Sequence, residues 1–251
     1  MSNLTYLVTG ANRGIGKGLA ADLLLRPNTT VIAGVRDVAA SSSILSALPT
    51  GAGSKLIVVK LDSSIETDAA SAVSELTTKH SITSLDVVIA NAGMAHSGSP
   101  VAEVPVSALK EHFNVNTIGP VVLFQAVAPL LKASTNAPKF LAITTIIGSL
   151  ASQELMPPNT HFTPYGASKA ALNWVIRRVH FENEWLTAYV SHPGLVKTDL
   201  TARLIGDETA KAIGAITVAE SAAGLLKTLD AATRETVGGA FRTYDGTALP
   251  W

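Results

Sequence analysis

The sequence predicts an α/β fold in which a doubly wound parallel sheet of about seven strands is flanked by helices. Short apolar runs alternate with longer segments of helical pattern along the whole chain, as in proteins built from strand–helix–strand units. Several of the apolar runs are continuously hydrophobic, which is typical of strands buried on both faces of a parallel sheet. No repeat, low-complexity tract or break in composition divides the 251 residues, so we expect one domain over residues 1–251.

Seven runs qualify as strands because they are short, apolar and bounded by turn-forming residues. They are residues 4–8, 30–35, 55–60, 85–90, 140–144, 188–191 and 240–243. Five segments carry the helical pattern: residues 15–26, 65–80, 107–132, 165–183 and 218–231. Thr217 and Glu220 form a capping box at the start of the last helix. Residues 39–54 are mostly small, with one proline and two glycines, and predict a surface loop.

The amino-acid composition excludes several classes of partner and of functional site. The formal net charge is zero, 15% of residues are charged and 47% are hydrophobic, so a large core can be buried and nothing indicates a nucleic-acid partner. The absence of cysteine excludes disulfides, thiolate metal sites and cysteine nucleophiles. The six histidines show no ligand spacing, so we predict no metal. The longest apolar stretch, residues 119–131, is too short to span a bilayer. No targeting pattern is visible, and we expect a cytoplasmic protein without a membrane partner.

A glycine-rich turn lies between the first predicted strand and the first predicted helix. Its residues are Gly10, Ala11, Asn12, Arg13, Gly14, Ile15 and Gly16. The first glycine allows a tight turn, the second lets the backbone approach a pyrophosphate, and the third lets the helix pack close to the sheet. A plain strand-to-helix turn is the alternative, but the position after a strand and before a helix favours a dinucleotide site.

Tyr165 and Lys169 lie four residues apart in a predicted helix and therefore share one face. A free tyrosine has a pKa near ~10, and a cation held close to it favours the phenolate and lowers that pKa. The pair predicts a tyrosine that donates a proton and a lysine whose positive charge lowers the pKa of that tyrosine. Taken alone, the same spacing also occurs on ordinary surface helices.

With Asn91, Ala92 and Gly93 after the fourth predicted strand, these motifs stand in the order and at the places that resemble the short-chain dehydrogenase/reductase family. The resemblance covers essentially the whole chain. The start of the glycine turn and the C-terminal residues look like the branch that contains carbonyl reductases, C-factor-like proteins and fungal norsolorinic-acid-type ketoreductases. The resemblance to this family implies a Rossmann fold whose N-terminal part binds a dinucleotide and whose C-terminal part binds and converts the substrate.

The resemblance also implies roles for further residues. Asn116 would hold a water for proton relay, the alternative being a buried asparagine that only makes hydrogen bonds. Thr145 stands where the family has a serine, so it keeps the hydroxyl and adds a methyl group. Asp62 would contact the adenine, unless it serves as a helix cap. The segment beneath the nicotinamide would contain Pro193, Gly194, Val196 and Thr198.

Two arginines bear on the choice of cofactor. NAD-dependent enzymes of this type usually carry an acid at the end of the second strand, where this chain has Val35 followed by Arg36. Arg13 lies in the glycine turn. Two guanidinium groups suit a ribose 2′-phosphate, whereas the alternative is a pair of solvated arginines, one of them beside Asp37. We therefore expect NADP(H).

The pattern as a whole predicts an NADPH-dependent ketoreductase that transfers hydride to a carbonyl of an apolar or aromatic small molecule, with Tyr165 as proton donor. A non-redox isomerase, lyase or cyclase that binds NADP(H) structurally, and an NADP(H)-binding sensor, are the alternatives. Residues 153–163 are expected to form a loop beside the substrate, in which His161 either touches the substrate or, as is more common for a loop histidine, is solvated. The apolar tail, residues 244–251, is expected either to dock on its own subunit or to be buried in a homodimer or homotetramer.

Overall fold

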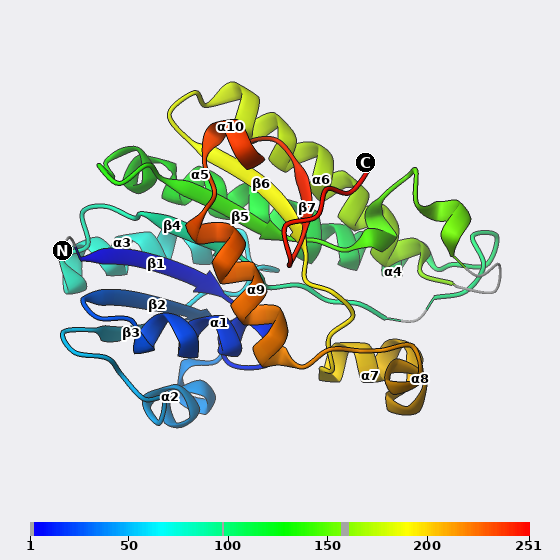
Figure 1. The fold of residues 1–251 in the computed structure, drawn as a ribbon, viewed down its shortest axis with the longest axis horizontal. Coiled ribbons are helices and arrows are strands. Elements are labelled where there is room, and N and C mark those ends of the chain that lie inside the picture. The colour runs from blue at the N-terminus through cyan, green and yellow to red at the C-terminus, as the bar shows by residue number, and fades with distance from the viewer. Residues whose placement is uncertain (1–2, 97, 157–160) are drawn as a thin grey trace.

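A seven-stranded, fully parallel sheet forms the centre of the molecule (Figure 1). The computed structural model describes residues 3–96, 98–156 and 161–251. The strand order is β3-β2-β1-β4-β5-β6-β7, so the chain winds outward from β1 in both directions. The strands are β1 (Leu4–Thr9), β2 (Thr29–Val35), β3 (Lys55–Lys60), β4 (Val87–Ala90), β5 (Lys139–Ile143), β6 (Thr187–His192) and β7 (Phe241–Thr243). The predicted doubly wound α/β fold is confirmed.

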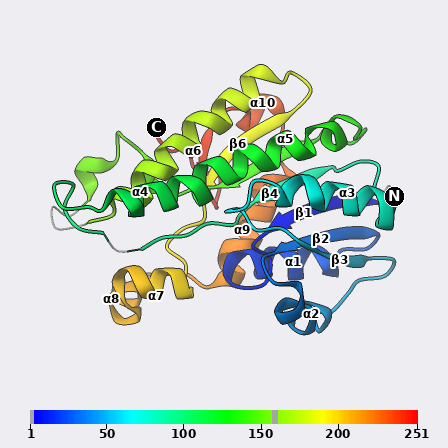
Figure 2. The same cartoon turned by 180° about the vertical axis from the view of Figure 1, so that it is seen from behind.

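Helices cover both faces of the sheet (Figures 1 and 2). One face carries α1 (Gly14–Leu25), α2 (Val38–Ser46), α9 (Val218–Asp230) and α10 (Arg234–Val237), and the other carries α3 (Asp68–His80), α4 (Val106–Phe113), α5 (Gly119–Lys132) and α6 (Thr163–Glu182). Two short helices, α7 (Asp199–Ile205) and α8 (Asp207–Ala212), follow β6.

Alternate residues of each buried strand supply the two cores. In β1, Leu7 packs in the core beneath α3, α5 and α6, while Tyr6 and Val8 pack in the core beneath α1 and α9. Successive side chains of a strand point to opposite faces, so a strand covered on both faces must be apolar throughout. This is why the strands could be recognised as continuous hydrophobic runs.

Two predicted elements were wrong in part. Residues 39–54 are not all loop, because α2 fills the first half. Asp37 caps this helix by accepting a hydrogen bond from the Ala40 amide at 3.0 Å, and Leu45 anchors it in the core. The single helix predicted over residues 107–132 is continuous in the chain but contains a π-helical turn, η1 (Asn114–Ile118). Serine-rich composition concealed the first feature, and apolar periodicity cannot show the second.

Among the helices that the structure describes, the continuous stretch Val106–Lys132 is the one long and apolar enough to cross a membrane. Its side chains Leu123, Val127 and Leu131 lie in the core with residues of α3 and α6. This packing is that of a core helix in a soluble fold.

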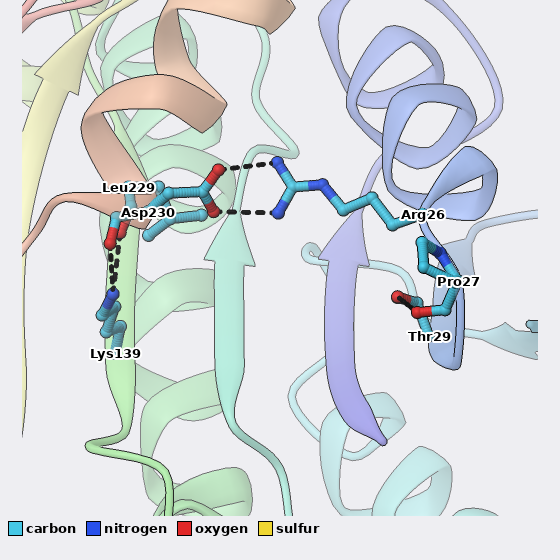
Figure 3. Close-up of polar contacts among 6 residues, drawn as sticks. All are labelled: Arg26, Pro27, Thr29, Lys139, Leu229 and Asp230. Carbon is cyan, nitrogen blue, oxygen red and sulfur yellow. Dashed lines mark hydrogen bonds and ion pairs between the residues drawn. The ribbon is translucent and has the colours of Figure 1, made fainter. Parts of the chain in front are cut away.

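The ends of α1 and α9 are joined at the edge of the sheet where the strands begin (Figure 3). The Arg26 guanidinium donates to both carboxylate oxygens of Asp230, at 2.8 and 2.9 Å. Lys139, the first residue of β5, donates from Nζ to the Leu229 carbonyl at 2.8 Å and so binds the C-terminal end of α9. These contacts fix α1, and with it the glycine turn, relative to the sheet.

Candidate active site

The glycine turn between β1 and α1 has the backbone shape that its sequence predicts. Gly10 and Gly14 adopt positive φ angles of 66° and 52°, a region that favours glycine. A Cβ on Gly16 would lie 2.3 Å from the Gly10 carbonyl oxygen, so no side chain fits there. The turn therefore brings the N-terminus of α1 close to the sheet, with its unpaired N–H groups directed at the space where a phosphate would bind.

Asn91, Ala92 and Gly93 hold this turn against the end of β4. The Asn91 side chain donates from Nδ2 to the Thr9 carbonyl at 2.9 Å. The Thr9 hydroxyl in turn accepts from the Asn91 and Ala92 amides, at 3.1 and 3.0 Å. Asn91 thus acts on a cofactor site through the backbone of the turn. Thr9 was not singled out from the sequence, although a hydroxyl at the end of a buried strand was a usable signal.

The four residues expected to carry the chemistry come together at the carboxyl edge of the sheet. Tyr165 and Lys169 lie on α6, Asn116 in η1, and Thr145 two residues after β5; all four are buried. The Thr145 side chain lies beside the Tyr165 hydroxyl and favours its ionised form. The ammonium group of Lys169 donates to the Ile143 carbonyl at 2.8 Å.

Two glycines let these groups approach one another. A Cβ on Gly93 would lie 3.2 Å from Asn116 Oδ1 and 3.5 Å from Lys169 Nζ, so the backbone at Gly93 borders both side chains. Gly148, in the 3-10 turn after Thr145, faces α6 so closely that a Cβ would lie 2.9 Å from the Lys169 carbonyl carbon. The glycines therefore set the distance between α6 and the strand ends.

The Asn116 side chain is fully engaged in holding structure. Its Oδ1 accepts from the Met94 amide at 2.9 Å, and its Nδ2 donates to the Met94 carbonyl at 2.9 Å and to the Ser168 hydroxyl at 3.0 Å. This matches the alternative of a buried, hydrogen-bonding asparagine. Pro120 has no N–H, so it cannot donate the hydrogen bond that an α-helix would give to the Asn116 carbonyl.

Burial governs the protonation of the central pair. It raises the pKa of Tyr165 to about 12, with the neighbouring Thr145 side chain acting in the opposite, lowering direction. Burial also lowers the pKa of Lys169 to about 8. The expectation that Lys169 lowers the pKa of Tyr165 is wrong for this structure, because loss of solvation dominates at the tyrosine. Near neutral pH the tyrosine holds its proton firmly, as an acid that donates only to a strong base would.

The predicted cofactor-selecting residues lie at the ends of β2 and β3. Val35 is fully buried, and Arg36 follows it at the carboxyl edge of the sheet. Arg13 forms an exposed ion pair of 3.5 Å with Asp199 in α7. Asp62 accepts from the Ser64 amide and hydroxyl at 2.9 and 2.7 Å, so it caps a local turn. It does not cap α3, whose N-cap residue is Thr67.

The segment after β6 lies opposite the glycine turn. A Cβ on Gly14 would be 3.5 Å from the Thr198 methyl carbon. Pro193 is held by the Ser221 hydroxyl, which donates to its carbonyl at 2.6 Å, and Gly194 has a φ of 83°. The Val196 carbonyl accepts from the Thr201 hydroxyl at 2.6 Å, and Thr198 caps α7. The pattern of Thr198 followed by Asp199 was a helix-start signal that the sequence reading missed.

The C-terminal tail docks on its own subunit, which is one of the two expected arrangements. The Trp251 ring lies 5.6 Å from the Phe241 ring, with the Arg177 guanidinium 4.8 Å from its centre. The Ala151 amide donates to the Trp251 carbonyl at 2.9 Å. The hydroxyl of Ser149 is buried and donates to the Pro250 carbonyl at 2.9 Å, so this serine does not face Tyr165.

The loop expected beside the substrate is described only at its two ends. Residues 157–160 lie outside the described residues. The first part contains a 3-10 turn, Gln153–Leu155, with Leu155 exposed. At the other end the His161 carbonyl accepts from the Gly98 amide at 2.7 Å. Within the described ranges, no three His, Asp or Glu side chains gather as a metal site would require.

Comparison with known proteins places this arrangement in a family. The family model for short chain dehydrogenases matches residues 5–209. A norsolorinic acid ketoreductase of Dothistroma septosporum is 46% identical over 252 residues, covering 98% of this chain and 92% of that protein. The norsolorinic acid ketoreductase of Aspergillus parasiticus is 43% identical, covering 98% and 90%. An NADPH-bound carbonyl reductase from chicken fatty liver superimposes with a TM-score of 0.86 at 28% identity, covering 100% of both chains. The chain therefore belongs to the short-chain dehydrogenase family of oxidoreductases.

Proposed function

We propose that the protein is an NADPH-dependent ketoreductase that reduces a carbonyl group of an apolar or aromatic small molecule. The observation that carries the proposal is the placement of the Thr145 side chain beside the Tyr165 hydroxyl, whose pKa it lowers, next to buried Lys169, which donates to the Ile143 carbonyl at 2.8 Å. The relatives named as norsolorinic acid ketoreductases, at 46% and 43% identity, support an aromatic ketone as the first substrate class to test.

The side chains of this protein account for the proton transfer in the reaction. When bound, a reduced nicotinamide supplies the hydride that adds to the carbonyl carbon. Tyr165 donates its proton to the oxygen as negative charge develops there, and Thr145 donates a second hydrogen bond to the same oxygen. A phenol whose pKa is raised to about 12 releases its proton to an alkoxide, which is a far stronger base. Lys169 holds the ribose from the same face of α6.

The glycine turn fits a dinucleotide. The positive φ angles of Gly10 and Gly14 and the tight packing of Gly16 against the Gly10 carbonyl give the kind of turn that presents the N-terminus of α1 to a pyrophosphate. Val35 places no carboxylate near the ribose, and Arg36 supplies a cation for a 2′-phosphate. Arg13 joins it when it leaves its exposed pair with Asp199, which contributes little to stability.

The cofactor assignment is tested by substitution at Arg36. Loss of one charge-assisted contact corresponds to roughly tenfold to a hundredfold in affinity. Arg36→Ala should therefore raise the KM for NADPH by about that factor and leave the KM for NADH nearly unchanged. Lys17→Ala, which removes a cation on α1, is the control. An equal rise for both cofactors in Arg36→Ala would show that no 2′-phosphate is bound there.

The remaining parts of the proposal concern the whole protein. We assign dinucleotide binding to the N-terminal part and substrate binding to the C-terminal part of one domain, residues 1–251. A small-molecule carbonyl or alcohol is the expected partner, in a cytoplasmic homodimer or homotetramer. Gel filtration with light scattering tests the assembly.

The reaction itself is tested by following NADPH absorbance with a panel of hydroxylated aromatic ketones, aliphatic ketones, aldehydes and quinones. One NADPH oxidised for each alcohol formed, abolished in Tyr165→Phe while NADPH still binds, supports a ketoreductase. Conversion of a substrate without net oxidation of NADPH would favour a non-redox enzyme. Binding of NADPH with no turnover across the panel, and no effect of Tyr165→Phe on binding, would favour a sensor.

A further inference from the structure

His112 is a fully buried residue of α4 that the proposed reaction does not use. Both of its ring nitrogens are engaged. Nδ1 lies 2.7 Å from the Ala108 carbonyl, and Nε2 lies 3.2 Å from the backbone amide of His96. A carbonyl can only accept, so Nδ1 carries the proton; Nε2 is then a bare acceptor for the His96 N–H. The tautomer of this ring is thus set by its two partners.

The segment that His112 binds, residues 94–96, borders the catalytic groups. Met94 is held through its amide and carbonyl by the Asn116 side chain, and the preceding Gly93 lies against Asn116 and Lys169. Farther along, a Cβ on Gly98 would lie 3.2 Å from Cδ of Pro164, the residue before Tyr165. The two glycines that flank the segment thus lie against Lys169 on one side and against the residue before Tyr165 on the other.

Packing alone does not account for a histidine at this place. Burying an imidazole is unfavourable unless its nitrogens are hydrogen-bonded, and an apolar side chain of similar volume would fill the same space. What the ring adds is an acceptor for a backbone N–H in a segment outside any helix or strand. The His96 and His112 rings also meet edge to face at 5.5 Å, which fixes the same part of the segment.

We propose that His112 is a positioning residue which, through the bond from Nε2 to the His96 amide, sets the backbone of residues 94–96 and so shapes one wall of the carbonyl site. The proposal rests on the ketoreductase function proposed above. Because the bond is made at residues 94–96 and not at the glycine turn, we expect it to act on carbonyl binding far more than on NADPH affinity.

A pair of substitutions separates the acceptor from the shape of the ring. His112→Phe keeps a ring of similar size without an acceptor, and His112→Gln offers an amide oxygen near the place of Nε2. Loss of one buried hydrogen bond corresponds to about tenfold in affinity, so His112→Phe should raise the carbonyl KM by about that factor. The Kd for NADPH should stay within about twofold, and His112→Gln should recover most of the lost carbonyl affinity. His80→Phe, at the end of α3, is the matched control.

Three kinetic outcomes overturn the proposal: an unchanged carbonyl KM in His112→Phe, an equal loss of NADPH affinity, or a His112→Gln variant as impaired as His112→Phe. A second measurement needs no variant. In ¹⁵N-histidine-labelled wild-type protein, the ring assigned to His112 should show a protonated Nδ1 and a bare Nε2, and a proton on Nε2 would overturn the proposal even if His112→Phe failed to fold. A wild-type protein that reduces no carbonyl would count against the ketoreductase function alone, and the tautomer would still decide whether His112 binds His96.

Discussion

Thr145 is the proposed site residue at which this chain departs from its family, which has a serine at this position. Its hydroxyl accepts from the Ile147 amide at 3.3 Å, and its side chain lies beside Tyr165, whose pKa it lowers. The added methyl group therefore leaves the side chain next to the tyrosine that we propose as proton donor. The sequence could predict the hydroxyl but not its direction.

Substitution at Thr145 distinguishes a working donor from a bystander. Thr145→Ser should retain most of the turnover, because the donor remains. Thr145→Val keeps the shape without the hydroxyl, and kcat should fall by about 10²-fold or more, the usual loss for one oxyanion-stabilising donor. Thr144→Val is a matched control, since the Thr144 hydroxyl donates to Asn173 at 2.6 Å and should change stability more than kcat. Similar rates for Thr145→Ser and Thr145→Val would mean that the hydroxyl takes no part.

Burial of Lys169 affects the stability of the folded protein, because removal of its ammonium group from water disfavours the charged form. Its pKa is lowered to about 8 from an ordinary 10.5. The folded protein therefore loses this proton at lower pH than the unfolded chain does. Below pH 8 the buried charge lowers stability, and this penalty disappears as pH rises from about 8 toward 10.5. The lysine that the proposed reaction needs therefore lowers the stability of the folded protein near neutral pH.

Lys169→Met should therefore abolish turnover and yet make the cofactor-free protein more stable at pH 7, by on the order of 1–3 kcal/mol. Urea unfolding at pH 7 and pH 9.5 checks this, and the advantage of the methionine variant should shrink at the higher pH. A wild type that is the more stable protein at pH 7 would show that the bond from Lys169 to the Ile143 carbonyl outweighs the cost of burying the charge.

At the scale of elements, the strands and the long helices were predictable, whereas the local irregularities were not. A strand buried on both faces must be apolar throughout, so β1, β2 and β5 are visible in the sequence. The π-turn η1 is not visible, because widening one turn moves backbone hydrogen bonds without changing which side chains are apolar. The role of His112 was missed for a similar reason, since its partner is the backbone amide of His96.

The contact of α6 with the 3-10 turn after β5 depends on Gly148. A Cβ there would lie 2.9 Å from the carbonyl carbon and from Cβ of Lys169, so Gly148→Ala must displace α6. We expect a loss of roughly 1–3 kcal/mol in unfolding free energy, as for other overpacked sites, together with a fall in kcat as Tyr165 moves from Thr145.

Gly51→Ala is the matched control for this displacement. It creates an even closer overlap, 2.4 Å from the Leu25 carbonyl oxygen, in a loop far along the chain from α6. Gly51→Ala should lose stability but keep its kcat once folded. If Gly148→Ala lost stability and kept kcat as well, the spacing of α6 would not control the chemistry.

At the scale of the whole molecule, the C-terminal third holds both halves of the site through two buried serines. Ser149 donates to the Pro250 carbonyl and accepts from the Ser152 amide at 3.1 Å, which ties the segment leading into the predicted substrate loop to the tail. Ser221, on α9, donates to the Pro193 carbonyl at 2.6 Å and ties the predicted nicotinamide segment to the helix that Arg26 and Lys139 hold at its other end (Figure 3). Neither bond could be predicted, because each joins residues far apart in sequence.

These two serines should separate carbonyl binding from cofactor binding. Both are fully buried and both donate to a proline carbonyl, so each serves as the control for the other. Ser149→Ala should raise the carbonyl KM several-fold, up to about tenfold, with little change in NADPH affinity, because the tail then holds residues 149–152 less firmly. Ser221→Ala should weaken NADPH binding by a similar factor and leave the carbonyl KM at saturating NADPH unchanged.

Steady-state kinetics with each substrate varied in turn, alongside the Kd for NADPH, would measure both effects. If the two variants altered the same constant, the tail and α9 would not act on separate halves of the site, and the assignment of residues 149–163 to the substrate and 193–198 to the nicotinamide would have to be abandoned.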